Sequence, residues 1–335
     1  MKPNNIYMRR ALELASLGSG TAQPNPMVGA VLVHEGRIIG EGYHHRYGEP
    51  HAEVMAIASV RDKDRPLLGE STLYVTLEPC SHYGKTPPCA ELIVRTGIPR
   101  VVVAQLDPFP LVAGHGIELL RRAGIEVELG CMEDEARALN KAFNHRHEHA
   151  RPYILLKWAE SEDGYMDAHR SNRGTAPILF SSPYQNRLVH RLRRDYQAIL
   201  VGANTAHLDN PSLTNRYWGE RQPIRIILDW RLSLDPNLKV FTDGIAPTWV
   251  IYDEALSLGN VQQASEQIRY IPSPPCIETV VQRLAQEGIN SLLVEGGSRT
   301  LNLFIERGLY DELQCEKSSI RLGSGVLAPC HCLKS

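Results

Sequence analysis

Short apolar runs alternate with amphipathic stretches along the first 145 residues of the chain. Apolar runs bounded by turn residues predict strands, and apolar positions three or four residues apart predict helices. The predicted strands are 28–33, 37–42, 72–77, 100–105 and 125–129, the first two forming a hairpin. The predicted helices are 52–60, 90–96, 116–123 and 133–143. This alternation indicates an α/β layer with a largely parallel sheet.

A second α/β pattern follows a polar stretch at 144–152, which predicts a solvated linker. His145, His147 and His149 in this stretch have a spacing that suits no familiar metal site. The later strands are expected at 153–159, 198–201, 224–228, 249–252 and 292–294, and the helices at 183–194, 277–287 and 298–307. We therefore expect two domains, 1–145 and 151–335, each large enough to bury its own core.

Composition excludes several classes of protein. Lys and Arg number 36 against 38 Asp and Glu, a net charge of −2, which argues against a protein built mainly to bind nucleic acid or an anionic membrane. No apolar run approaches the ~20 residues of a spanning helix, and no signal peptide is evident, so we expect a cytoplasmic protein. Seven cysteines at irregular spacing predict no disulfide framework.

Histidine and cysteine residues in the first half predict a zinc site. His51 and Glu53 open a predicted helix, Cys80 follows a predicted strand, and Cys89 precedes the next helix. One imidazole and two thiolates fill three tetrahedral positions of Zn²⁺ and leave the fourth for water, whose pKa then falls to about 7. Glu53 then moves a proton to the leaving amine, as in zinc deaminases. The alternative is a closed structural site, with a fourth ligand among His44, His45 and His82.

Four segments around these residues carry a resemblance to a known family: 24–29, 42–44, 48–54 and 77–89. They include Pro-Asn-Pro at 24–26, His-Ala-Glu at 51–53 and Glu-Pro-Cys at 78–80, with a long loop to Cys89. The chain resembles the bifunctional riboflavin-biosynthesis deaminase-reductases. That resemblance implies a cytidine-deaminase-like α/β/α domain with one Zn²⁺ per chain, held by His51, Cys80 and Cys89, and Glu53 as the proton shuttle.

The resemblance also implies contacts to the deaminase substrate. The residues concerned are Asn25, His44, Lys85 and Asp107. From the sequence alone, Asn25 between two prolines equally predicts a turn, and His44 a loop histidine with its own hydrogen bonds. One departure is clear, because Phe109 stands where the family often carries Asn.

The second half contains a strand, a Gly296-Gly297 turn and a helix, an arrangement that suits phosphate binding at a helix N-terminus and equally an ordinary tight connection. Segments 157–164, 201–216, 223–229 and 295–297 resemble the reductase half of the same family. They imply a dihydrofolate-reductase-like α/β domain that uses NADPH. The implied cofactor contacts are Ala159, Thr205, Asp209, Gly297, Ser298, Arg299 and Thr300. The implied substrate contacts are Arg193, Leu213, Arg216 and Glu295, although Arg193 alone would predict a solvated helix face.

The expected function is a two-step reaction in riboflavin biosynthesis. It comprises hydrolytic deamination of 2,5-diamino-6-(5-phosphoribosylamino)pyrimidin-4-one and NADPH reduction of the ribosyl side chain of 5-amino-6-(5-phosphoribosylamino)uracil. The alternatives are a deaminase with an inactive reductase-like domain, since the chain ends before the family's last strands, and a deaminase acting on a nucleic-acid base. We expect a phosphorylated pyrimidine substrate and neither nucleic acid nor membrane as partner, with a homo-oligomer through the reductase domain kept open.

Overall fold

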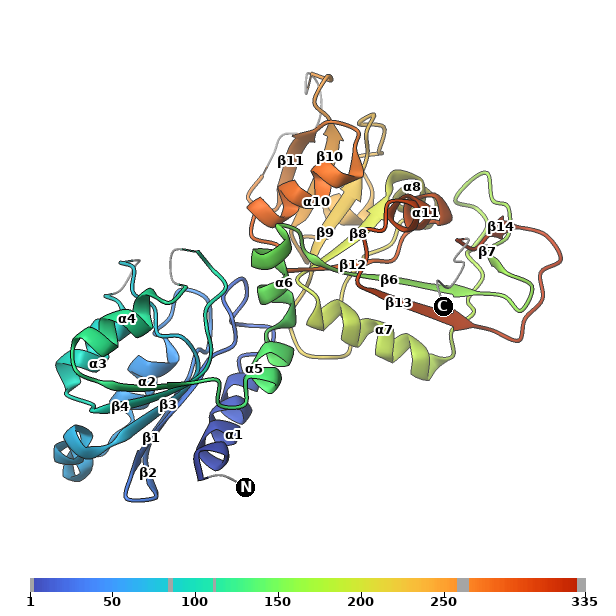
Figure 1. Cartoon of the computed structure of the whole chain (residues 1–335). Helices are drawn as coiled ribbons and strands as arrows, with labels where there is room; N and C mark the ends of the chain where they lie inside the picture. Colours follow the sequence, from blue (N-terminus) through green and yellow to red (C-terminus); the bar gives the residue numbers. More distant parts are fainter. Residues whose placement is uncertain (1–2, 84–86, 111–112, 258–264, 330–335) are drawn as a thin grey trace. The chain divides into compact units, whose positions relative to one another are not determined.

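The computed structural model describes residues 3–83, 87–110, 113–257 and 265–329, with the side chains described from residue 5 onward. The chain forms two compact units, Met1–His149 and Ala150–Ser335 (Figure 1). No helix within the described ranges has the length and apolar character needed to cross a membrane.

The first unit is built on a five-stranded sheet of order β2-β1-β3-β4-β5. Its strands are β1 (Gly29–His34), β2 (Arg37–Tyr43), β3 (Thr72–Leu77), β4 (Arg100–Gln105) and β5 (Glu126–Leu129). The predicted hairpin is confirmed, since β1 and β2 pair antiparallel. β1 is also antiparallel to β3, whereas β3, β4 and β5 run parallel. The predicted strands agree with these bounds to within one residue at each end.

Helices cover both faces of this sheet. α2 (Ala52–Ala58), α3 (Cys89–Thr96), α4 (His115–Arg122) and the 3₁₀ segment η1 (Asp62–Glu70) supply apolar side chains to one face. α1 (Pro3–Ser16) and α5 (Glu133–Leu139) supply them to the other. Successive strand residues point to opposite faces, so Leu73 and Val75 join the first cluster and Tyr74 the second. The expected α/β/α arrangement is confirmed.

The polar stretch expected to be a linker is mostly helical. Residues 144–149 belong to α6 (Lys141–His149). Phe143 and Asn144 are buried in this helix, at 8% and 3% exposure. A polar segment need not be solvated when other parts of the fold offer it hydrogen-bond partners. In α6, the buried Asn144 side chain accepts from the Gln105 side chain at 3.1 Å.

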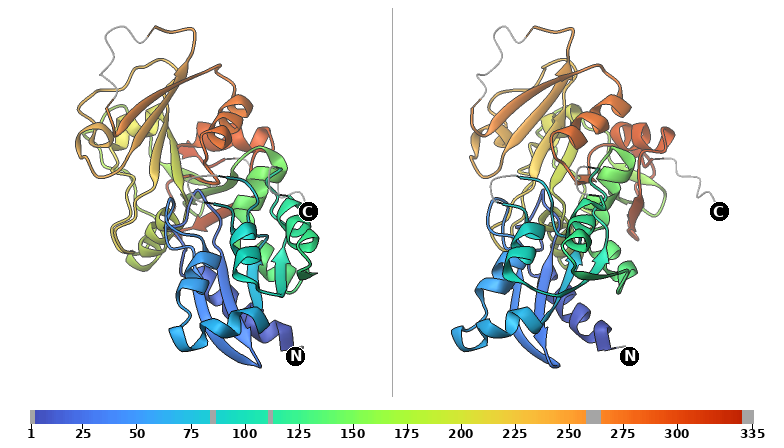
Figure 2. Two further views of the ribbon diagram at one scale, coloured as in Figure 1. Left: turned by 90° about the vertical axis from the view of Figure 1, so that its left-hand side faces the viewer. Right: turned by 60° about the vertical axis from the view of Figure 1, so that its left-hand side comes forward.

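The second unit contains a seven-stranded sheet of order β11-β10-β9-β8-β12-β6-β13. Its strands are β6 (Tyr153–Glu160), β8 (Ala198–Gly202), β9 (Ile224–Leu228), β10 (Thr248–Asp253), β11 (Ile268–Ser273), β12 (Ser291–Val294) and β13 (Glu312–Lys317). All adjacent pairs are parallel. Figure 2 shows β9–β11, yellow to orange, from two further sides. A short pair, β7 (Tyr165–Asp167) and β14 (Val326–Leu327), lies outside this sheet.

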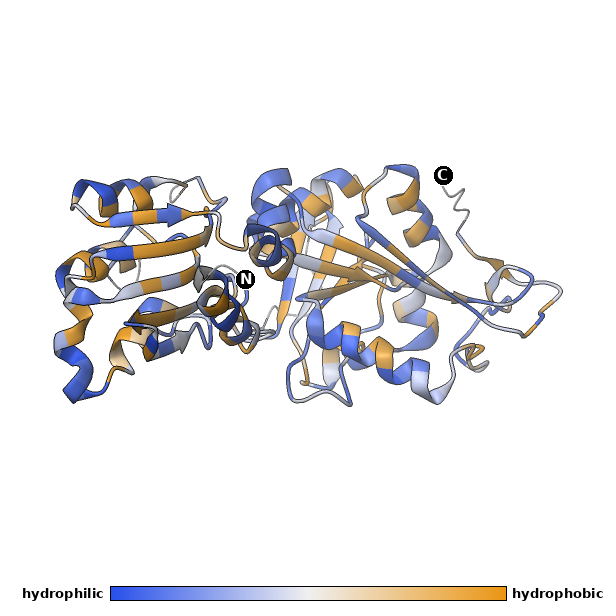
Figure 3. Cartoon of the chain, turned by 60° about the horizontal axis from the view of Figure 1, so that its bottom comes forward, coloured by the Kyte–Doolittle hydropathy of each residue, from blue (hydrophilic) through white to orange (hydrophobic). Residues whose placement is uncertain are grey.

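Helices again cover both faces of the sheet. α10 (Ile277–Gln286) and α11 (Ser298–Glu306) pack on the face that carries Ile154 and Leu156. α7 (Pro183–Asp195), α8 (Ala203–Asp209) and α9 (Lys239–Thr242) adjoin the face that carries Leu155, where Leu192, Ala206 and Val240 pack. Hydrophobic residues recur at intervals along these helices and concentrate in the strands (Figure 3). The α/β class expected for this half is confirmed.

Candidate active sites

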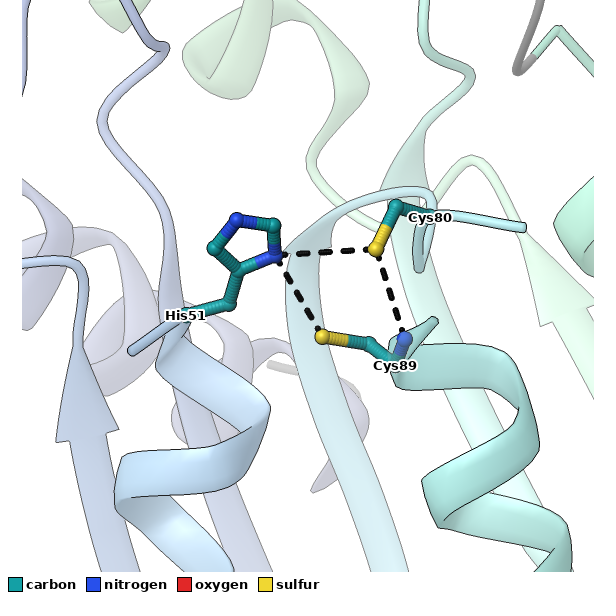
Figure 4. A group of neighbouring side chains, drawn as sticks. All are labelled: His51, Cys80 and Cys89. Atoms are coloured by element: carbon teal, nitrogen blue, oxygen red, sulfur yellow. Dashed lines mark hydrogen bonds between the residues drawn. The ribbon is translucent and has the colours of Figure 1, made fainter. Parts of the chain in front are cut away.

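Three potential metal ligands meet in the first unit. His51 Nδ1 lies 3.6 Å from Cys80 Sγ and 3.4 Å from Cys89 Sγ (Figure 4). The three ligand atoms all lie within 4.8 Å of one another. The structure therefore brings together side chains that are 29 and 38 residues apart in the chain.

The spacing of these atoms fits a tetrahedral zinc ion. With Zn–S bonds of about 2.3 Å and a Zn–N bond of about 2.0–2.1 Å, nitrogen and sulfur in a tetrahedral site lie about 3.6 Å apart. The observed distances of 3.6 and 3.4 Å agree with that value. Among the described residues, the group contains no fourth histidine, cysteine or carboxylate. The arrangement thus matches an open three-ligand site better than the closed structural alternative.

Local backbone structure explains how the three ligands converge. His51 directly precedes α2, Cys80 follows the end of β3, and Cys89 is the first residue of α3. The backbone N–H of Cys89 donates to Cys80 Sγ at 3.3 Å. The hydrogen bond with Cys89, followed by the one with His51, lowers the pKa of the Cys80 thiol. The hydrogen bond with Cys80, and then burial, raise the pKa of the Cys89 thiol, because the two adjacent sulfur atoms share one proton. A bound metal cation would displace that proton.

Glu53 lies in the first turn of α2, two residues after His51, and is 3% exposed. Burial raises the pKa of its carboxyl group to about 7. His51 and Glu53 line the same cavity, which has a volume of about 290 Å³. A buried carboxyl group at this position is able to exchange protons with a reactant in the cavity.

Three of the predicted substrate contacts also line this cavity: Asn25, His44 and Asp107. His44 Nδ1 lies 3.2 Å from the Pro50 carbonyl oxygen, which only accepts, so Nδ1 carries the proton. Its Nε2 therefore accepts from the Asn25 amide at 3.1 Å. Burial lowers the pKa of His44, which favours this neutral ring. Lys85 lies outside the described residues.

Two further carboxylates shape the cavity wall. Burial raises the pKa of Asp107 to about 6, and Asp107 Oδ1 accepts from the Phe109 N–H at 2.8 Å. The sequence did not predict a structural role for Glu78. Its carboxylate accepts from the backbone N–H groups of Gly114 and Gly116 at 2.9 Å, at the start of α4. A carboxylate at a helix N-terminus is stabilised by the helix dipole, so Glu78 ties the end of β3 to α4.

The second unit contains a larger cavity, of about 690 Å³. Most of the predicted reductase residues line it: Ala159, Arg193, Thr205, Asp209, Arg216, Glu295, Gly297 and Ser298. Leu213, Arg299 and Thr300 are not among the lining residues. Leu213 is buried in the core and Arg299 is exposed, and their contacts stay predictions.

The Gly296-Gly297 turn is required by its surroundings. A Cβ atom on Gly296 would collide with Val201, and one on Gly297 would lie 2.8 Å from Thr205 Oγ1. Gly297 has a φ of +62° and directly precedes α11. A helix N-terminus next to an open cavity presents backbone N–H groups suited to a phosphate. The donor set at this turn therefore fits the diphosphate of a dinucleotide cofactor.

Arg193 does not lie on a solvated helix face. Its Nε and Nη2 donate to the two carboxylate oxygens of Glu295 at 3.0 and 2.6 Å. The two side chains are 16% and 11% exposed, so the pair is largely shielded from water. The hydrophobic pattern of α7 could not reveal this contact, because the partner is 102 residues away in the chain.

Two residues of this cavity region were missed by sequence reasoning. His190 is fully buried, and its Nε2 accepts from Arg216 Nη2 at 2.9 Å. Burial, and then the charges of Arg193 and Arg216, lower the pKa of His190 to about 4, so it is a neutral acceptor. Arg170 lines the cavity and forms ion pairs with Asp167 and Asp209. No motif distinguished either residue in the sequence.

Comparison with known families assigns both halves of the chain. Residues 1–105 match the cytidine and deoxycytidylate deaminase zinc-binding region, and residues 152–329 match the RibD C-terminal domain. The His51, Cys80 and Cys89 group falls within the first match. The large cavity with the Gly296-Gly297 turn falls within the second.

Relatives and solved structures match nearly the whole chain. The riboflavin biosynthesis protein RibD of Aquifex aeolicus is 44% identical over 322 residues, which is 96% of this chain and 88% of that protein. A crystal structure of a diaminohydroxyphosphoribosylaminopyrimidine deaminase/5-amino-6-(5-phosphoribosylamino)uracil reductase from Thermotoga maritima has a TM-score of 0.82 and 38% identity, covering 97% of this chain and 89% of its own. Acinetobacter baumannii RibD has a TM-score of 0.84 and 34% identity, covering 98% and 90%. The chain belongs to the RibD family of riboflavin-biosynthesis proteins.

Proposed function

We propose that this chain is a bifunctional enzyme that catalyses two consecutive steps of riboflavin biosynthesis. The first unit deaminates 2,5-diamino-6-(5-phosphoribosylamino)pyrimidin-4-one hydrolytically. The second unit reduces the ribosyl side chain of 5-amino-6-(5-phosphoribosylamino)uracil to ribityl with NADPH. The observation that carries the proposal is the meeting of His51, Cys80 and Cys89 beside a cavity that His51, Cys80 and the buried Glu53 line.

In the deaminase unit, His51, Cys80 and Cys89 would hold zinc, which supplies a nucleophilic water at neutral pH. Glu53 takes up a proton on its carboxylate and delivers it to the leaving amine. Asn25, held by the neutral ring of His44, offers donor and acceptor atoms to the edge of the pyrimidine. Buried Asp107 lines the same cavity and would contact the substrate there.

In the reductase unit, Ala159, Thr205, Asp209, Gly297 and Ser298 line the cavity and would hold NADPH, which supplies the hydride when bound, and Arg299 and Thr300 stay predicted contacts. Arg193, Arg216 and Glu295, which line the cavity, would bind the substrate, and Leu213, which is buried, stays a predicted contact. The Arg193–Glu295 pair and the His190–Arg216 bond hold two guanidinium groups at the cavity. These contacts favour an active reductase over the alternative of an inactive reductase-like domain.

The substrate class is a small phosphorylated pyrimidine and not a nucleic acid. The net charge of −2 supports a small-molecule substrate, because binding a polynucleotide requires a basic surface. Self-association through the reductase domain and the cytoplasmic location stay predictions.

A coupled assay tests the proposed function. The zinc-loaded protein is supplied with the diaminopyrimidine phosphate and NADPH, and ammonia release and NADPH absorbance are followed together. Both signals are expected, with ammonia appearing first. If the protein releases ammonia from the diaminopyrimidine phosphate but oxidises no NADPH, even when the deaminated intermediate is supplied directly, only the monofunctional alternative remains.

A further inference from the structure

Helix α6 forms part of the wall of the deaminase cavity. Phe143, Arg146 and His147 all line this cavity. Their spacing of three and four residues places them on one face of α6, shown in green in Figure 1. Arg146 and His147, which lie in the stretch that the sequence predicted to be solvated, therefore belong to the cavity wall.

Two side-chain contacts fix α6 against other segments of the cavity. Asn140, directly before α6, accepts from the Met27 N–H and donates to the Met27 carbonyl, both at 2.8 Å. Met27 lies in the loop that carries Asn25. The buried Asn144 Oδ1 accepts from the Gln105 side chain at 3.1 Å, at the end of β4. These hydrogen bonds hold α6 against the loop that carries Asn25 and against the end of β4.

Arg146 is oriented by its neighbour. Its Nη2 lies 2.9 Å from His147 Nε2, and a guanidinium only donates, so Nε2 is the acceptor. Burial, and then the charge of Arg146, lower the pKa of His147 to about 4, which keeps the ring neutral. A guanidinium carries five N–H donors, so this bond is compatible with further bonds from the same group.

The ring of His147 is packed between two aromatic side chains. Its centroid lies 5.1 Å from that of Phe109 and 4.6 Å from that of Phe143. Phe109 therefore supports the Arg146–His147 pair by packing against the imidazole ring.

Charge makes Arg146 distinctive in this cavity. Among the described residues that line it, Arg146 is the one Lys or Arg side chain, whereas Glu53, Glu78 and Asp107 are acidic. We propose that Arg146 binds the phosphate group of the deaminase substrate and that His147 is its positioning residue. This inference rests on the proposed function, which gives the substrate a phosphate. The planar guanidinium is well suited to bidentate phosphate contacts.

Steady-state kinetics of ammonia release test this assignment. Arg146→Ala and Arg146→Lys are compared with the unaltered enzyme on the diaminopyrimidine phosphate and on its dephosphorylated form. Loss of charge-assisted bonds to phosphate is expected to raise KM for the phosphorylated substrate about 10- to 100-fold in Arg146→Ala, and less in Arg146→Lys. The value of kcat changes by no more than about threefold if Arg146 contributes only uniform binding. Lys141→Ala, an exposed cation on the same helix, is the matched control and leaves KM unchanged.

A second readout isolates the phosphate. Ribose 5-phosphate is expected to inhibit ammonia release competitively in the unaltered enzyme, and its inhibition constant is expected to rise in Arg146→Ala in proportion to KM. His147→Gln retains a side-chain acceptor and is expected to fall between the unaltered enzyme and Arg146→Ala. If Arg146→Ala unfolds, as judged by zinc content and thermal unfolding, Arg146→Lys and Arg146→Gln carry the same comparison.

Two results would overturn the assignment. One is an unchanged KM for the phosphorylated substrate in the folded Arg146 variants. The other is an equal loss on the phosphorylated and dephosphorylated substrates, which would indicate a purely structural role. Failure of the proposed function itself is distinguishable, because the unaltered protein would then release no ammonia from either compound.

Discussion

Replacing Glu295 with glutamine removes one charge from a shielded ion pair in the reductase cavity. In the unaltered protein, Glu295 accepts two hydrogen bonds from Arg193, at 3.0 and 2.6 Å. The amide of glutamine has one oxygen and one NH₂ group, so it can accept only one of the two. The charge of Arg193, whose side chain is 16% exposed, is then left without compensation.

The expected loss of stability follows from these two effects. A hydrogen bond to a charged group contributes roughly 1.5–3 kcal/mol, and removing one partner of a buried ion pair typically costs about 3–5 kcal/mol. The pair here retains some access to solvent, so we expect Glu295→Gln to lower the free energy of unfolding of the second unit by about 3 kcal/mol.

The pH dependence of this loss has a definite sign. Burial raises the pKa of Glu295, but the Arg193 guanidinium outweighs burial and lowers it below the ordinary value of 4.5. A carboxyl group with a lowered pKa in the folded state stabilises the fold above its unfolded pKa. That contribution is lost as the pH falls below 4.5 and through the folded-state pKa. The difference between the unaltered protein and Glu295→Gln is therefore largest at neutral pH and shrinks in acid.

Tryptophan fluorescence isolates the unit concerned, because all four tryptophans, Trp158, Trp218, Trp230 and Trp249, lie in the second unit. Urea unfolding is followed at pH 7 and below pH 4.5. Glu278→Gln, in the exposed Arg307–Glu278 pair, is the control and is expected to have a far smaller effect. Equal losses in the two variants, or a Glu295→Gln loss that grows in acid, would refute the reasoning.

Two further substitutions probe the same unit. Gly297→Ala places a Cβ atom 2.8 Å from Thr205 Oγ1 at a φ of +62° and is expected to raise KM for NADPH about 10-fold or more. Gly219→Ala, at a φ of +75° with open space around its Cβ, shares only the backbone strain and should leave KM unchanged. Because the pKa of His190 is lowered to about 4 in the folded state, this histidine is protonated at a higher pH in the unfolded state than in the folded state. The second unit is therefore expected to lose stability of the order of 3 kcal/mol as the pH falls from 6.5 to about 4. In His190→Gln this pH dependence of unfolding should be visibly flatter, and an unchanged profile would contradict a buried neutral histidine.

Buried strands were the part of the fold most easily predicted from sequence. Strands such as β3 and β4 are continuous apolar runs, and their ends coincide with turn residues. β13 at the sheet edge has no buried residue, and its charged sequence gave no apolar signal. α1 was not predicted, although Met8, Ala11 and Ala15 are buried at helical spacing and Pro3 stands at its first position, where proline favours the start of a helix.

The candidate sites show a similar division. The zinc ligand types and Glu53 could be predicted because metal chemistry restricts the residue types and places them at element ends. Glu78, His190 and Arg170 could not, because each acts through contacts with residues distant in the chain. Residues 144–149 of α6 were predicted as part of a linker for the same reason, since Arg146 and His147 meet a cavity formed mainly by other segments.

The most direct test of the proposed deaminase chemistry is a paired measurement on Glu53→Gln, of zinc content and of ammonia release. Glutamine keeps the size of the side chain but cannot transfer a proton, so zinc should stay at one ion per chain while ammonia release falls at least about 100-fold. NADPH oxidation with the deaminated intermediate should remain unchanged in the same preparation. Ammonia release close to that of the unaltered enzyme, with zinc in place, would contradict the role assigned to Glu53.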